Sequence, residues 1–260
     1  MTQRARADEL REYYVVKAND LIRKGRYNLT TQQQKIVLYA ISKIRKNDDP
    51  NQFYEIPIEE ICDACGLELD TGGFYYKAIK NDLKKLTARQ FVQFPDKSEW
   101  SVSWFADVGI VPLSGTVYVK FHERLWPYLF DLQERYTQYR LEEVLVFRSK
   151  YSIRLFEILR SHFTRDELAS GTEKEITLTV DQIRRQLEIT AYPSWKEFNR
   201  NVIKKAVDEI NLCSEDMSIS YVTQREGHSI NRIVFTVSAP EGFKDRMSRY
   251  QNSKRRLKRL

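Results

Sequence analysis

Apolar and polar residues follow the same order in two separate stretches of the chain. Residues 54–67 and 176–189 align without gaps, and their apolar residues then coincide. The coinciding pairs are Ile56 with Leu178, Ile58 with Val180, and Ile61 with Ile183. Each stretch predicts a short strand leading into a short helix, preceded by a longer amphipathic helix and followed by another helix and hairpin strands. This order predicts an α+β fold in which a winged helix-turn-helix occurs twice in tandem.

The first copy begins with a long helix whose start is marked by a cap. Thr30 or Thr31 can form a capping box with a glutamine three residues later, and apolar residues at helical spacing continue to Ile44. The Asn-Asp-Asp-Pro sequence at 47–50 then ends this helix. The other elements predicted here are a strand at 53–56, helices at 58–65 and about 74–88, and wing strands at 90–94, 100–105 and 116–121.

A helix is also predicted between the two copies, from Tyr128 to about Arg140, with Pro127 suited to its first turn. We place the domain boundary at its end. This division gives an N-terminal domain at 1–140, a C-terminal domain at 141–243 and a basic tail at 244–260.

The second copy opens with an amphipathic helix from Tyr151 to Phe163, like the long helix of the first copy. Two further helix starts follow from the spacing of the capping box, which is met by Thr179 with Gln182 and by Ser194 with Glu197. Strands at 217–225 and 230–238 are predicted to form a hairpin that turns at 226–228.

Length and composition narrow the class of protein. A chain of 260 residues is long enough for about two domains with cores of their own, in agreement with the repeat. No apolar run approaches the roughly 20 residues of a membrane span, and residues 1–11 are too charged for a signal peptide. Three cysteines do not make a disulfide framework. We therefore expect a soluble, cytoplasmic protein with no membrane partner.

The net charge of +7 is concentrated at one end of the chain. Residues 241–260 hold eight lysines and arginines against two acids, or +6, so the preceding 240 residues carry only +1. Nucleic-acid contacts by the folded part must therefore come from basic residues gathered on one face. The tail itself predicts either a disordered, sequence-independent phosphate binder or a solubilising terminus.

The helix that begins after Ser194 has one apolar face and one polar face. With about 100° per residue, one side carries Trp195, Phe198, Val202, Ala206 and Ile210. Glu197, Arg200 and Asn201 lie opposite, near the helix start, where a recognition helix meets base edges. Arginine can bond guanine, asparagine adenine, and glutamate cytosine. We predict that these three residues read bases and that Lys196 and Lys204 contact the DNA backbone; an ordinary solvated face is the alternative.

The equivalent helix of the first copy has a more basic outer face. Its inner side is predicted to carry Tyr75, Tyr76, Ile79, Leu83 and Leu86. Lys77, Lys80, Asn81 and Lys84 then face outwards, and lysine attracts phosphates but discriminates bases poorly. We therefore predict that the second domain reads sequence, while the first supplies backbone contacts and self-association.

The turn of the second hairpin is a further candidate for DNA contact. It carries Arg225, His228, Asn231 and Arg232, where a wing would lie against the backbone or the minor groove. A solvated turn explains these residues equally well.

Residues for several kinds of catalysis are missing from the sequence. The three histidines, at 122, 162 and 228, are too far apart to be the paired metal ligands that a rolling-circle initiator needs beside its nucleophilic tyrosine. A phosphate-binding Gly-x-x-x-x-Gly-Lys-Ser/Thr loop is absent as well. We predict a protein that is not an enzyme and has no cofactor.

Two cysteines and two tryptophans have both a functional and a structural interpretation. Cys62 and Cys65 have a spacing seen in zinc sites, but two further ligands at sensible spacing are missing. Cys65 also aligns with Leu187 in the repeat, so we predict core packing and no metal. Trp100 and Trp104 could stack on bases, but alternation in a strand favours core packing.

Three short sequences together resemble those of the iteron-binding plasmid replication initiators of the RepE, RepA and Pi types. These sequences are Tyr-Thr-Gln-Tyr-Arg-Leu at 136–141, Tyr-Ser-Ile-Arg-Leu-Phe-Glu at 151–157 and Glu-Ile-Asn at 209–211. The resemblance spans about residues 15–240 and leaves the basic tail without a counterpart. It implies a bacterial protein with tandem winged-helix domains, whose main base-reading helix falls on residues 194–211.

The resemblance also implies partners. A monomer would bind directly repeated origin sites, open an adjacent AT-rich region and recruit the host initiator and the replicative helicase. A dimer joined through the first domain would repress the protein's own gene at an inverted repeat. The residues alone leave two alternatives open, namely a transcription regulator without a replication role and, less well supported, a single-strand or RNA-binding module.

Overall fold

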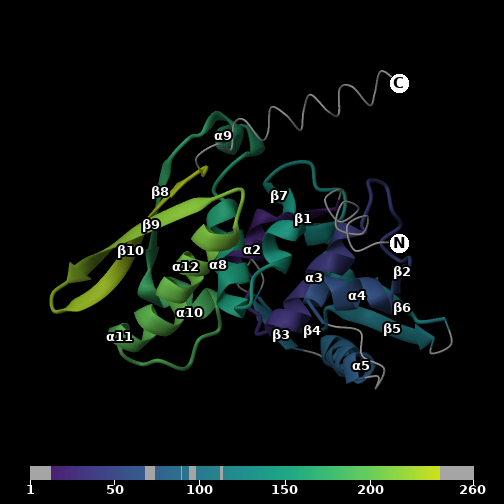
Figure 1. Ribbon diagram of the computed structural model, residues 1–260. Helices are drawn as coiled ribbons and strands as arrows, with labels where there is room; N and C mark the ends of the chain where they lie inside the picture. Colours follow the sequence, from purple (N-terminus) through teal and green to yellow (C-terminus); the bar gives the residue numbers. More distant parts are fainter. Residues whose placement is uncertain (1–12, 68–73, 89, 94–97, 112–113, 241–260) are drawn as a thin grey trace.

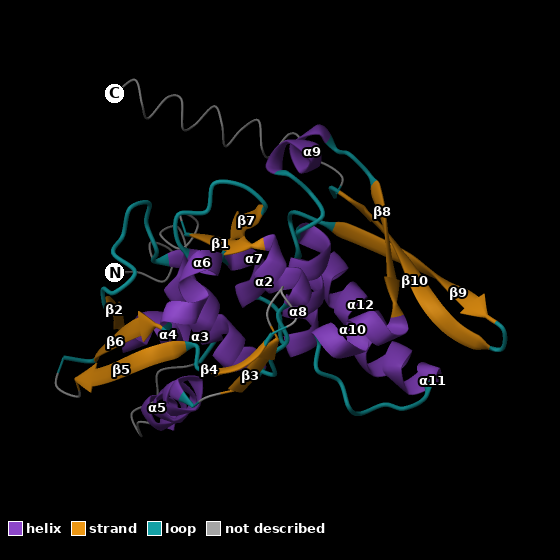
Figure 2. Cartoon of the chain, turned by 180° about the vertical axis from the view of Figure 1, so that it is seen from behind, coloured by secondary structure: helices purple, strands orange, loops and turns teal. Residues whose placement is uncertain are grey.

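The computed structural model describes residues 13–67, 74–88, 90–93, 98–111 and 114–240, and consists of two halves built from helices and small antiparallel sheets (Figure 1). The halves lie side by side. A β-hairpin of each half points outwards, and the two hairpins lie at opposite ends of the molecule (Figures 1 and 2). The basic tail at 244–260 lies outside the described residues. None of the helices in the described ranges is long and apolar enough to cross a membrane.

The first half follows the predicted order around helix α3 (Thr31–Ser42), which a complete capping box begins at Thr30. Strand β2 (Tyr54–Pro57) leads into α4 (Ile58–Cys65), and α5 (Phe74–Thr87) follows. The sheet order is β2-β6-β5, with β5 at Phe105–Val111 and β6 at Thr116–Phe121. The strand predicted at 100–105 is wrong, because this stretch divides into β4 (Glu99–Val102), paired with β3 (Gln90–Gln93), and the start of β5.

The helix predicted over 128–140 is also wrong. A short 3₁₀ turn, η1 (Glu123–Leu125), and helix α6 (Trp126–Leu129) end before it, and Asp131 and Arg135 take positive φ angles that break helical geometry. Strand β7 (Tyr136–Arg140) follows and pairs with β1 (Tyr14–Ala18) at the start of the described chain. Thr137 and Tyr139 are buried while their neighbours are not, which is the two-residue period of a strand. Helices α2 (Asn19–Lys24) and α7 (Glu142–Leu145) flank this ribbon.

The second half repeats the arrangement. It opens with α8 (Lys150–Arg160) and α9 (Arg165–Ser170), and strand β8 (Lys174–Thr179) then leads into α10 (Val180–Gln186) through the capping box predicted at Thr179. The next helix is continuous from Trp195 to Cys213 and consists of α11 (Trp195–Phe198), a π-helical turn η2 (Asn199–Ile203) and α12 (Lys204–Cys213). The hairpin of β9 (Ser218–Glu226) and β10 (Ser229–Ser238) completes a sheet of order β8-β10-β9.

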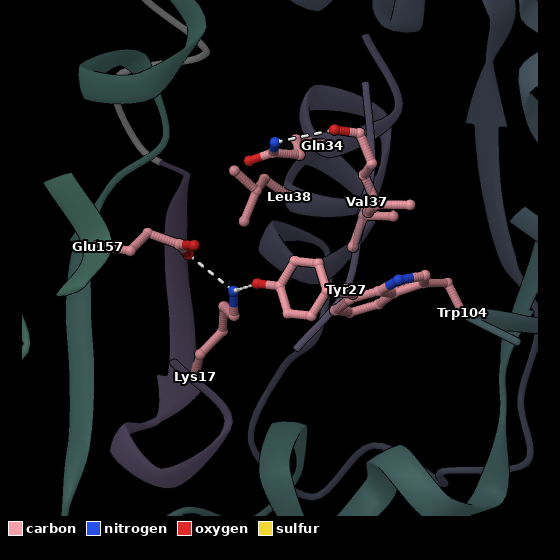
Figure 3. Close-up of a pocket in the computed structure, with 8 residues that line it drawn as sticks. Lys17, Tyr27, Gln34, Val37, Leu38, Trp104 and Glu157 are labelled. Carbon is pink, nitrogen blue, oxygen red and sulfur yellow. Dashed lines mark hydrogen bonds and ion pairs between the residues drawn. The ribbon is translucent and has the colours of Figure 1, made fainter. Parts of the chain in front are cut away.

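A buried ionic cluster joins the first strand, the ribbon and α8. The Lys17 ammonium lies 2.8 Å from the Glu157 carboxylate, and both side chains are almost fully buried (Figure 3). Tyr139 donates a hydrogen bond to the same carboxylate at 2.7 Å, and Arg154 lies 3.2 Å from its other oxygen. Tyr27 accepts hydrogen bonds from Lys17 and Arg154. Burial raises the pKa of Glu157, but the two cations outweigh it and hold the pKa below its usual value.

His162, in the turn after α8, should make the stability depend on pH. Burial, with nearby Arg23 and Lys174, lowers its pKa from 6.5 to about 4. The unfolded chain therefore binds the proton first as the pH falls, so the contribution of His162 to stability is complete above about pH 6.5 and declines towards pH 4. We expect a loss of about 1–2 kcal/mol, less than the full linkage because the ring is partly exposed. Urea unfolding of the wild type and of His162→Gln at several pH values in this range tests it. The same dependence of the unfolding free energy on pH in both proteins would contradict it.

Candidate nucleic-acid interface

The helix from Trp195 to Cys213 has the predicted cap and the predicted buried face. Ser194 accepts a hydrogen bond from the backbone of Glu197, as a capping residue does. The residues Phe198, Val202, Ala206 and Ile210 are fully buried, and Trp195 is half-buried against the core. The prediction, which assumed a constant 100° per residue, did not include Ile203 and Val207 in the buried face. Both are buried, because the π-helical turn changes the phase of the helix.

The opposite face exposes the residues predicted to read bases. Glu197 and Arg200 are exposed and Asn201 is half-buried, all within the first two turns of the helix. The Asn201 amide donates to the Glu197 carbonyl at 2.9 Å, and the Glu197 carboxylate accepts from the Ser194 hydroxyl at 2.9 Å. These contacts pre-order two hydrogen-bonding groups beside Arg200, which reduces the entropy lost on binding.

The two lysines predicted to contact the backbone are exposed on the same helix. Lys196 lies in its first turn, and Lys204 forms an ion pair with Asp208 at 2.7 Å. An exposed pair of this kind is worth little, so Lys204 can exchange its carboxylate for a phosphate at small cost.

The hairpin of β9 and β10 places its basic turn beside the helix. Arg225, His228 and Arg232 are exposed, whereas Asn231 is half-buried and donates to the Glu226 carboxylate across the turn. A groove of about 460 Å³ separates the turn from the start of α11. Its lining includes two arginines, Arg184 and Arg225, against one acid, Asp181, together with Trp195 and His228. A groove of this character can take a phosphodiester strand.

Arg184 was not among the predicted site residues, although it lines this groove. Its guanidinium donates to the carbonyl oxygens of Ala191 and Tyr192, and lies 4.3 Å from the ring centre of Phe198. It therefore holds the loop between α10 and α11 in place. The repeat could have identified it, because Arg184 aligns with the buried Cys62 of the first copy. Arginine is rarely buried without a polar partner, so an arginine at this position indicates a specific contact.

Helix α5 exposes the basic residues predicted for the first half. Lys77, Lys80, Asn81 and Lys84 are all exposed. The acidic residue among them, Asp82, accepts a hydrogen bond from Gln33 of α3 at 2.9 Å. This contact draws the carboxylate towards the core and leaves the outer face of α5 positive. The inner face packs as predicted, with Ile79, Leu83 and Leu86 buried and the two tyrosines half-buried.

The two helices lie on the same side of the molecule. Helices α5 and α11 both lie along the lower edge in Figures 1 and 2, at opposite ends, and the hairpins extend beyond them. A single duplex laid along that edge could therefore meet both helices.

Core packing was predicted for two cysteines and two tryptophans, and the structure confirms it for only some of them. Cys62 is fully buried and Cys65 is half-buried against the core, and burial raises the pKa of their thiols to about 11 and about 12. Within the described ranges, no three metal-ligating side chains come together. Trp104 is buried as predicted, but Trp100 is 44% exposed and stacks against the Arg124 guanidinium, 3.4 Å from its ring centre. The prediction for Trp100 is wrong because its side of β4 lies open.

Comparison with known families decides the identity of the fold. A family model described as initiator replication protein, WH1, matches residues 14–160, and a second described as initiator Rep protein, WH2, matches residues 179–237. The chain belongs to the initiator replication protein family. Both the predicted family and the predicted α+β fold of two winged-helix domains are thereby confirmed.

This initiator is similar to two proteins of Escherichia coli. It is 23% identical over 229 residues to a replication initiation protein, covering 87% of this chain and 70% of the relative. It is 24% identical over 148 residues to the PI protein, covering 52% of this chain and about half, 46%, of that relative. Its fold is similar to that of the Pi initiator protein in a crystal structure with iteron DNA. The TM-score is 0.73 at 19% identity, covering 89% of this chain and 99% of the other.

The short sequences that carried the resemblance belong to the initiator's framework. Tyr139, Arg154 and Glu157 form the buried ionic cluster. The Glu209 carboxylate accepts from the backbone of Arg148 and Ser149, at 2.7 and 3.2 Å, and so fixes the recognition helix against the start of α8. These sequences therefore identify the architecture.

Proposed function

We propose that the protein is a plasmid replication initiator that binds directly repeated origin sequences, or iterons, in duplex DNA. The observation that carries the proposal is the outer face of a capped helix, with Glu197 and Arg200 exposed and Asn201 half-buried, at the same edge of the molecule as helix α5 (Figure 1). Membership of the initiator family supports it, and so does the likeness in fold to a protein solved with iteron DNA. We propose that the energy of this binding drives opening of the adjacent DNA.

The proposed contacts are divided between the two halves. Glu197, Arg200 and Asn201 read base edges in the major groove. Backbone contacts come from two groups, one in the second half (Lys196, Lys204, Arg225, His228, Asn231 and Arg232) and one on α5 (Lys77, Lys80, Asn81 and Lys84). Residue chemistry supports the assignment of the lysines, because ammonium groups bind phosphates as point charges while arginine and amides can bond bases in pairs. The residues of the hairpin turn are assigned to the DNA backbone by their place on a wing.

The proposal extends to partners and to domains. A monomer binds each repeat and recruits the host initiator and replicative helicase, and a dimer joined through the first domain represses the protein's own gene at an inverted repeat. We keep the division into domains at 1–140 and 141–243 with a basic tail at 244–260. In this proposal the protein acts in the bacterial cytoplasm and catalyses no reaction itself.

Footprinting on the DNA upstream of the gene tests the two-helix arrangement. Two recognition helices on one face of a duplex meet major grooves about one turn apart, so a protected stretch of about 20 base pairs per repeat is expected. Protection of about ten base pairs would show that only one half binds. A second experiment distinguishes an initiator from a transcription regulator with the same fold. The gene with its upstream repeats should maintain an otherwise replication-deficient plasmid if the protein is an initiator, and should fail to do so if it is only a regulator.

Removing the lysines of α5 should weaken binding to all duplexes alike. Each phosphate contact contributes about 0.9 to the slope of log affinity against log salt, so Lys77→Ala, Lys80→Ala and Lys84→Ala together should flatten the slope by up to about 3. Titrations of a repeat and an unrelated duplex at several salt concentrations measure this slope. Lys46→Ala, an exposed lysine in the turn after α3, is the matched control. A triple variant that changed base preference would contradict the role given to α5.

A further inference from the structure

The recognition helix contains a turn of unusual geometry at the point where bases would be read. Residues Asn199–Ile203 form a π-helical turn between the α-helical segments α11 and α12. Such turns make up well under 1% of residues in proteins, and single π-turns within α-helices occur often at functional sites. The exposed Arg200 and the half-buried Asn201 lie within this turn.

The turn rotates the first part of the helix relative to the rest. Burial shows the change of phase, because the buried positions of α12 (Ala206, Val207 and Ile210) do not continue the spacing of those before the turn. Extending α12 backwards at 3.6 residues per turn would bring positions 199 and 196 to the core side. The residues that pack there are instead Phe198 and Trp195, one position earlier. The extra residue in the turn thus accounts for a rotation of about 100°.

This rotation decides which side chains face outwards. In a regular α-helix, Lys196 would point towards the core and Arg200 would lie at its edge. With the π-turn, both are exposed, on the side away from Phe198. Given the face that α12 buries, the turn is therefore what brings Lys196 and Arg200 to the outer side of the helix.

A side chain from the hairpin holds the first residue of the turn. The Tyr221 hydroxyl, on β9, donates to the Asn199 side-chain oxygen at 2.8 Å. The Tyr221 ring is half-buried and lies 6.0 Å from that of Phe235, so its position is fixed by packing. A second bond pair joins the far end of the helix to the same strand, because the Asn211 amide both donates to and accepts from the Ile219 backbone at 2.7 Å. The helix is thus attached to β9 at the π-turn and near the end of α12.

We propose that the hydrogen bond from Tyr221 to Asn199 holds the π-turn, and that the turn sets the rotation at which Arg200 and Asn201 meet the bases. Tyr221 is then a positioning residue for sequence specificity, without touching DNA itself. The inference rests on the proposed function, since it assumes that this helix reads base edges.

Binding selection from a duplex library with about 20 randomised base pairs tests the proposal in the full-length protein. Tyr221→Phe removes only the hydroxyl, and we expect its affinity for the site selected by wild type to fall about 3- to 10-fold. Its own selected sites should change at the base pairs nearest the helix start, while affinity for an unrelated duplex should stay within twofold. Asn199→Leu should give the same altered preference, and the double variant should be no worse than the single variants.

Thr223→Val, an exposed position on the same strand, is the matched control and should keep the wild-type preference. Equal weakening on every duplex, or unchanged preference in Tyr221→Phe, would overturn the positioning role. Additive losses in the double variant would overturn the link between the two side chains. A wild-type protein that selects no sequence at all would contradict the proposed function and this inference with it. The thermal unfolding of each variant, followed in parallel, shows whether a loss of binding is a loss of fold.

Discussion

Replacing Arg200 with alanine is expected to lower affinity for the repeat by about 5- to 150-fold and to relax specificity at one base pair. A bidentate arginine–guanine contact contributes about 1–3 kcal/mol of discrimination, and that discrimination disappears with the side chain. Affinity for unrelated duplexes should change little, because the backbone contacts remain. Titrations against the repeat and against each single base-pair substitution measure both effects.

The control for this experiment is Lys24→Ala. It removes an exposed cation from α2, outside the proposed interface, where the lysine pairs with Asp20. Comparison with Lys77→Ala then tests the division of labour between the halves. Equal loss of specificity in Arg200→Ala and Lys77→Ala would refute that division, and no loss in either would place base reading elsewhere.

Replacing Glu157 with alanine is expected to cause the largest loss of stability, about 3–5 kcal/mol. The substitution leaves the ammonium of Lys17 and the guanidinium of Arg154 buried without their carboxylate, and it removes the acceptor of the Tyr139 hydroxyl. Urea unfolding followed by circular dichroism gives the free energy of unfolding. Asp20→Ala, which breaks an exposed ion pair, is the control and should cost less than about 1 kcal/mol. A similar small loss for Glu157→Ala would mean that the cluster relaxes or admits water.

Elements with local signals could be predicted from the sequence. The cap at Thr30 and the capping box at Thr179 depend on residues three positions apart, so the information lies within one turn. The repeat gave the order of the helices in each half for the same reason. The apolar stripe of the recognition helix was predicted well enough to identify its exposed face.

Elements that depend on distant partners could not be predicted. Strand β7 forms because it pairs with β1, more than a hundred residues earlier, and its aromatic spacing by itself was compatible with a helix. The π-turn is bonded to Tyr221, on a strand beyond the end of the helix, and a uniform step along residues 195–210 carries no information on that contact. The exposure of Trp100 likewise depends on which side of β4 the neighbouring elements leave open.

The buried ionic cluster limits how the protein can be cut into fragments. A fragment that begins at residue 141 would keep Arg154 and Glu157 on α8 but lose Lys17, Tyr27 and Tyr139. Two charged groups would then be released to solvent along with the apolar side of their helix. A cut after α8 keeps the cluster whole within the preceding fragment and leaves β8, α10, the recognition helix and its hairpin as the downstream piece. The second cut has a cost of its own, because it takes α8 away from α12 and separates Glu209 from the backbone of Arg148 and Ser149. Fragments made by either cut should therefore fold less stably than the whole chain.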